Sequence, residues 1–133
     1  MAQSRKVLQE VGQLSIVDKL TSGGQLALFA PNGDTQAIGA NAVATNVSVT
    51  GVLTTVTTGN DTTGDTITVP NGTVIGQIKV IVLDVDGGDS LIVTPTNYAD
   101  GTTITFADAN DFCVLVWNGT AWRTIVNVGG TIA

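Results

Sequence analysis

From residue 47 onward the sequence is a succession of short runs rich in valine, isoleucine and threonine, separated by turn-forming residues. Branching at Cβ makes these side chains fit a pleated strand better than a helix. No stretch of helical periodicity separates the runs. The pattern predicts an all-β domain, an antiparallel β-sandwich or barrel-like fold. The expected strands are residues 47–58, 65–69, 76–84, 90–94, 102–106, 112–117 and 121–128.

The last expected hairpin carries both tryptophans of the chain around an Asn118-Gly119 pair. Asn-Gly favours a two-residue turn, which would place Trp117 opposite Thr120. A four-residue loop would pair Trp117 with Trp122 directly. Both registers put the two rings on one face of the sheet, so an aromatic clasp that packs the hairpin is expected. The alternative role for the two rings is a platform on which a sugar stacks.

Residues 1–46 have a different pattern. Val7, Val11 and Leu14 recur at spacings of four and three, which predicts a helix within residues 1–22. An extended arm that orders on a partner is the equal alternative, because an isolated helix of this length is marginal in water. A strand is expected at 25–30, and residues 35–44 are a second strand or a linker. We therefore divide the chain into an arm and connecting segment, 1–46, and a β domain, 47–133.

The composition argues against catalysis. The chain has no histidine, one cysteine and 12% charged residues, so a serine or cysteine nucleophile has no histidine base. A hydrolase with paired carboxylates would have no glutamate beyond Glu10. With a net charge of −6 and five basic residues, no cationic stripe is available for nucleic acid or an anionic membrane. We expect a structural or binding protein that is not an enzyme and needs no cofactor.

One set of carboxylates resembles a calcium loop. Asp84, Asp86 and Asp89 lie close together beside two glycines, an arrangement that Ca²⁺ could accept. The bidentate glutamate and flanking helices of an EF-hand are missing. A solvated hairpin tip is therefore the default interpretation, and no metal site is assigned. The single cysteine, Cys113, lies in an apolar run and is expected to be a small buried hydrophobe.

The mean hydropathy of +0.33 is high for a short chain without an apolar run long enough to span a bilayer. A small domain has a limited interior in which to bury that much apolar surface. Burial between subunits would account for it, so a homo-oligomer is expected.

Four segments of the second half of the chain carry a family resemblance: DTITVPNGT from Asp65, GQIKVIVL from Gly76, TPTNYADGTTITF from Thr94 and VWNGTAW from Val116. Together they resemble the β-rich modules of virion proteins from tailed bacteriophages, cyanophages in particular. The resemblance implies a homotrimeric, outward-facing β domain with an N-terminal segment that grips the particle. It also implies a virion location after synthesis in the host cytoplasm.

Within that family, the small size favours a capsid decoration (cement) protein that binds the major capsid protein and stabilises the head. A fibre or spike tip that binds a host receptor or glycan is the alternative, and a calcium-dependent adhesive module is a third. In the expected arm, basic and apolar residues are the candidates for capsid contact, with packing inside the same chain as the equal alternative. These candidates are Arg5, Lys6, Val7, Leu8, Val11, Leu14, Ile16, Val17 and Leu20.

Overall fold

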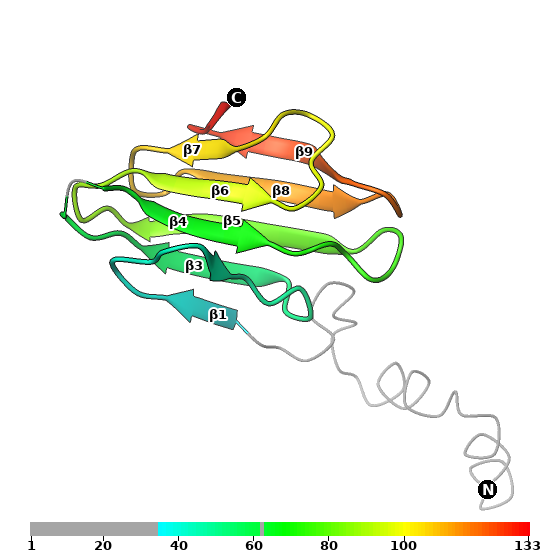
Figure 1. Cartoon of the computed structure of the whole chain (residues 1–133), viewed down its shortest axis with the longest axis horizontal. Coiled ribbons are helices and arrows are strands. Elements are labelled where there is room, and N and C mark those ends of the chain that lie inside the picture. The colour runs from blue at the N-terminus through cyan, green and yellow to red at the C-terminus, as the bar shows by residue number, and fades with distance from the viewer. Residues whose placement is uncertain (1–34, 62) are drawn as a thin grey trace, which may run out of the picture.

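The computed structural model of the chain describes residues 35–61 and 63–133, which form ten strands in two five-stranded sheets. Sheet A has the order β1 (Thr35–Ile38), β3 (Leu53–Thr57), β5 (Ile78–Val85), β8 (Phe112–Trp117), β9 (Trp122–Val128). Sheet B has the order β10 (Thr131–Ile132), β7 (Ile104–Phe106), β6 (Leu91–Pro95), β4 (Asp65–Val69), β2 (Thr45–Asn46). Figure 1 shows one sheet stacked in front of the other. The expected all-β class is confirmed, in a sandwich-like arrangement that does not close into a barrel.

The first six strands alternate between the two sheets. In sheet A, β1, β3 and β5 pair in parallel, and in sheet B, β2, β4 and β6 do the same. Each consecutive pair of strands is thus one turn of a flattened coil that stacks on the next turn. The expectation of a wholly antiparallel sandwich was wrong for this half. Turn-forming residues indicate where the chain reverses direction. In this half of the domain each reversal leads to a strand of the opposite sheet and not to a neighbouring strand of the same sheet.

The last four strands pair in the antiparallel manner that was expected. β7 adds to β6, β8 to β5, β9 to β8 and β10 to β7. They extend both sheets beyond the last turn of the coil, from β5 in sheet A and from β6 in sheet B. The predicted bounds of β4 and β8 match those of the structure, and the short strands β2 and β10 were not predicted.

The predicted boundary at residue 46 falls inside the β domain. β1 pairs with β3 and β2 pairs with β4, while Ile38 and Ala42 belong to the core. Residues 35–46 are therefore the first turn of the coil, because their few apolar side chains complete the core at that edge. The expected helix, the strand at 25–30 and all nine candidate contact residues lie outside the described residues.

Alternation along the strands places the core between the sheets. Ile81 and Leu83 of β5 and Leu115 of β8 point inward from sheet A, and Ile67 and Val93 point inward from sheet B. Cys113 is also buried among them, as expected. Burial raises the pKa of its thiol to about 12, so this cysteine is chemically inert at neutral pH.

Candidate functional site

Asp65 joins successive turns of the coil. Its buried carboxylate, at the start of β4, accepts hydrogen bonds from the backbone N–H groups of Ala42 and Gly59, the latter at 2.6 Å. Ala42 belongs to the first turn of the coil and Gly59 to the second. A buried backbone N–H needs such a partner, because desolvation without a hydrogen bond is costly. The Asp65 carboxylate thus links two successive turns of the coil.

The three carboxylates of the calcium-loop candidate do not converge on one point. Asp86 Oδ1 accepts a hydrogen bond from the Gly88 N–H at 2.8 Å, and Asp89 Oδ2 accepts one from the Asp61 N–H at 2.6 Å. Asp84 lies exposed near the end of β5. In residues 35–61 and 63–133, no group of three or more aspartate, glutamate, histidine or cysteine residues is arranged to hold a metal ion. These hydrogen bonds give Asp86 and Asp89 a role in the conformation of the loop.

Lys79 is a feature that the sequence analysis did not single out. Its side chain is fully buried, and Nζ donates hydrogen bonds to the carbonyl oxygens of Ser48 at 2.8 Å and Gly51 at 2.9 Å. Burial lowers the pKa of the amine from 10.5 to about 8. Strand alternation could have indicated the burial of Lys79. Lys79, Ile81 and Leu83 are spaced two residues apart, so their side chains share the inward face of β5. The amine holds the loop between β2 and β3 against the core.

The two tryptophans form the expected clasp. Trp117 lies directly opposite Trp122, which selects the four-residue loop over the two-residue turn. Asn118 Oδ1 accepts hydrogen bonds from the backbone N–H groups of Thr120 and Ala121, both at 2.9 Å. Trp122 is fully buried and Trp117 nearly so. Rings buried to this extent cannot serve as an open stacking platform for a sugar, so the packing role is confirmed.

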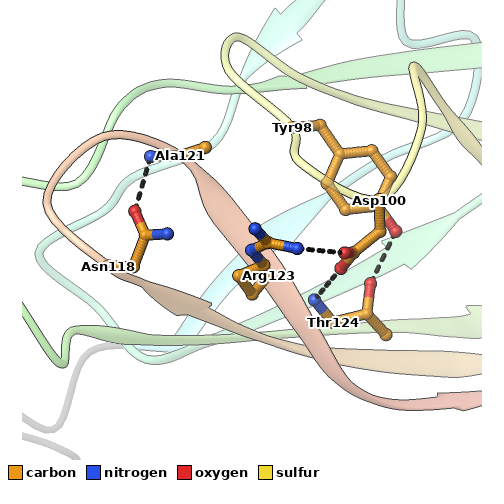
Figure 2. Close-up of polar contacts among 6 residues, drawn as sticks. All are labelled: Tyr98, Asp100, Asn118, Ala121, Arg123 and Thr124. Carbon is orange, nitrogen blue, oxygen red and sulfur yellow. Dashed lines mark hydrogen bonds and ion pairs between the residues drawn. The ribbon is translucent and has the colours of Figure 1, made fainter.

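A polar cluster from the loop after β6 covers the start of β9. Figure 2 shows Asp100 between the Arg123 guanidinium, 3.1 Å away, and the backbone N–H of Thr124, 2.7 Å away. The hydroxyls of Tyr98 and Thr124 are 2.5 Å apart. Hydrogen bonds, the backbone one from Thr124 foremost, hold the pKa of Asp100 below its usual 3.8. These contacts occupy the outer edge of β9, which would otherwise offer unpaired backbone groups to another strand.

The acidic residues of the described part gather at one end of the sandwich. Seven of the eight described aspartates lie where β3, β5 and β7 end and where β4, β6 and β8 begin. Asp100, the eighth, lies at the opposite end, as do both described basic residues, Lys79 and Arg123. This acidic end therefore has a negative potential of its own. Its members are Asp61, Asp65, Asp84, Asp86, Asp89, Asp108 and Asp111.

The described chain begins at the end opposite to the acidic end. β1 runs parallel to β3 and β5, so Thr35 lies beside Leu53 and near the start of β5. Three of the five basic residues of the chain, Arg5, Lys6 and Lys19, precede Thr35 in the sequence. The described domain thus has seven of its eight aspartates at one end of its strands and the entry of the N-terminal segment at the other.

No protein-family model matches this sequence, and no curated protein is significantly similar to it. In the part of the chain that the structure describes, no helix has the length and apolar character to cross a membrane.

Proposed function

We propose that this protein is a capsid decoration (cement) protein of a tailed bacteriophage. It binds the outer surface of the head as a homotrimer and stabilises the particle. The N-terminal segment attaches to the major capsid protein, and the β domain stands outward from it. The family resemblance of the segments beginning at Asp65, Gly76, Thr94 and Val116 supports the virion assignment.

The observation that carries the proposal is the polarity of the β domain. The N-terminal segment, whose three basic residues balance its three acidic ones, joins the domain at Thr35, at one end of its strands, and seven aspartates lie at the other. An outward acidic end keeps neighbouring homotrimers soluble and apart, because like charges repel. The buried Asp65 carboxylate accepts hydrogen bonds from backbone groups, which suits a scaffold.

Attachment is tested by co-sedimentation with undecorated capsids of the phage that carries the gene. Deletion of residues 1–22 is expected to abolish attachment and leave the circular dichroism of the β domain unchanged, because its core begins at Ile38. Arg5→Glu with Lys6→Glu should weaken attachment in the full-length chain. Asp108→Lys, an exposed charge reversal at the acidic end, is the matched control and should sediment like the wild type.

Stabilisation of the head has its own readout. Decorated capsids are expected to release their DNA at a higher temperature than undecorated ones, as followed with an intercalating dye. Retained attachment of the truncated chain would move the contact surface to the β domain. If the full-length chain binds host cells or glycans and not capsids, the protein is a fibre or spike tip and the decoration proposal fails.

A further inference from the structure

From β3 to β9 the outward face of sheet A is mostly apolar. Because Ile81, Leu83 and Leu115 point into the core, their neighbours along β5 and β8 point outward. The strand registers align these outward residues into rows that cross the sheet. The rows are Thr35, Leu53, Val80, Val114, Val126; then Ala37, Thr55, Val82, Phe112, Val128; and then Ile78, Val116, Arg123. We call this surface the aliphatic face.

The outward face of sheet B has a different character. Its rows are made mostly of threonine, and Ile92 is the one large apolar residue among them. Threonine suits a strand surface that faces water, because its hydroxyl can be solvated while its β-branch favours the strand. The rows are Thr66, Ile92, Thr105, Thr131 and Asn46, Thr68, Thr94. The outer face of sheet A is therefore more apolar than the outer face of sheet B.

A sheet that is apolar on both sides is usually covered on both sides. Five strands about 4.8 Å apart and three outward rows give the aliphatic face a footprint of roughly 400 Å². This footprint is comparable to the largest apolar patch of a typical monomer, about 300 to 600 Å². Val126 and Val128, at the β9 edge, are 39% and 46% exposed in the single chain. An apolar patch of this size on a sheet face is often functional, which makes this surface a candidate for contact with another chain.

Charge indicates what covers it. The chain has a net charge of −6, so contact between copies requires a surface without carboxylates at its centre. The aliphatic face meets this requirement, because its charged residues lie only at its two ends, Arg123 at one and the outward position Asp84 at the other. An apolar centre with a polar rim is the usual anatomy of a protein interface. The centre consists mainly of valine, which loses little rotamer freedom when it is buried.

We infer that the aliphatic face is the contact surface between copies of this chain. The inference deepens the proposed function, because it names the surface through which the homotrimer assembles. Each copy presents sheet A toward the shared axis and the threonine face of sheet B toward solvent. The β-branched rows pack against those of the neighbouring copies and form a second apolar layer outside the core of each domain.

The test compares two lysine substitutions at equivalent places in the two sheets. Val80 lies outward on β5, the central strand of sheet A, and Thr94 lies outward on β6, the central strand of sheet B. Light scattering coupled to size exclusion is run on full-length wild type, Val80→Lys and Thr94→Lys. We expect wild type and Thr94→Lys to share one oligomeric mass, and Val80→Lys to fall to the monomer mass of 13.6 kDa.

Folding is checked separately, so that loss of assembly is not confused with unfolding. Val80→Lys should keep the wild-type circular dichroism, because its side chain does not enter the core. If that variant does not fold, Val80→Thr with Val114→Thr replaces it, since threonine keeps the shape and the strand preference of valine. This double variant should raise the dissociation constant of the oligomer by at least about tenfold. An unchanged constant would overturn the inference.

The remaining outcomes separate this inference from the proposed function. A wild-type mass that persists in a folded Val80→Lys overturns the inference and leaves capsid binding intact. A monomeric wild type at micromolar concentration also overturns it, and if deletion of residues 1–34 then causes association, the N-terminal segment covers the face. A dimer that Val80→Lys dissociates supports the interface and contradicts the homotrimer. Assembly through this face without capsid attachment supports the interface and refutes the decoration role.

Discussion

Trp117 and Trp122 meet edge to face across the hairpin of β8 and β9, with ring centroids 5.5 Å apart and an interplanar angle of 60°. The Trp122 indole Nε1–H donates a hydrogen bond to the Pro70 carbonyl at 2.8 Å. Pro70 directly follows β4 of the other sheet. One buried side chain therefore connects the last hairpin, the core and the opposite sheet, and this arrangement makes the clasp a structural element.

Trp122→Ala is expected to lower the free energy of unfolding by about 3 to 5 kcal/mol, the usual range for truncating a buried aromatic side chain. Chemical denaturation followed by circular dichroism measures it. Trp122→Phe also leaves the Pro70 carbonyl without its donor, but it keeps an aromatic ring in the core. It should therefore lower the free energy of unfolding by less than the alanine variant does. If both variants keep the wild-type midpoint and lose adsorption to cells or glycans, the clasp is a recognition surface and not a packing one.

Lys79 predicts a pH dependence of stability with a definite sign. The pKa of its amine is about 8 in the folded protein and 10.5 when the side chain is exposed, so between these values the unfolded chain binds more protons. The free energy of unfolding should therefore rise as the pH increases from 8 to 10.5, by up to about 3 kcal/mol. Below pH 8 both states carry the charge and the Lys79 contribution is constant.

The buried Cys113 thiol opposes this trend above pH 9, because its pKa is raised in the folded protein. The Lys79 contribution is therefore measured as a difference between wild type and Lys79→Met, which share Cys113. We expect the stability of wild type relative to Lys79→Met to increase across pH 8 to 10.5. A difference that is flat with pH would mean that the amine is not desolvated in the folded protein.

Asp65→Ala should destabilise the protein by about 2 to 4 kcal/mol, because the buried N–H groups of Ala42 and Gly59 both lose their acceptor. Thermal or urea denaturation measures the loss. Asp61→Ala, in the loop that precedes β4, is the control. Its exposed carboxylate accepts hydrogen bonds from the N–H and hydroxyl of the nearby, exposed Thr63, so that variant should unfold close to wild type. Equal effects of the two substitutions would contradict the bracing role of Asp65.

The cluster in Figure 2 allows a comparison between an ion pair and a backbone cap. Arg123→Ala removes only a salt bridge whose arginine side chain is half exposed, so it should change stability by less than about 1 kcal/mol. Asp100→Ala also removes the acceptor of the Thr124 N–H and should cost more. Because the pKa of Asp100 is lowered in the folded protein, its contribution to stability is present at neutral pH and is lost as the pH falls below about 4. An Arg123→Ala effect as large as that of Asp100→Ala would place the stabilisation in the ion pair.

The sequence alone determined the secondary-structure class and much of the local geometry. Alternating β-branched runs predicted the bounds of β4 and β8, and parity placed Trp117 and Trp122 on one face whatever the turn. The apolar run around Cys113 predicted its burial. These features depend on side-chain alternation and turn chemistry, which are properties of neighbouring residues and can be read without knowing the fold.

Only the tertiary structure decided which strands pair and which surfaces result. The parallel coil, the inclusion of Ile38 and Ala42 in the core, and the burial of Lys79 all depend on contacts between residues far apart in the chain. The same holds for the aliphatic face, whose rows join Leu53 to Val80, Val114 and Val126. A strand pattern states which side chains share a face, but the partner of that face is chosen by long-range packing. For that reason the composition could indicate association, while the surface that accounts for it required the fold.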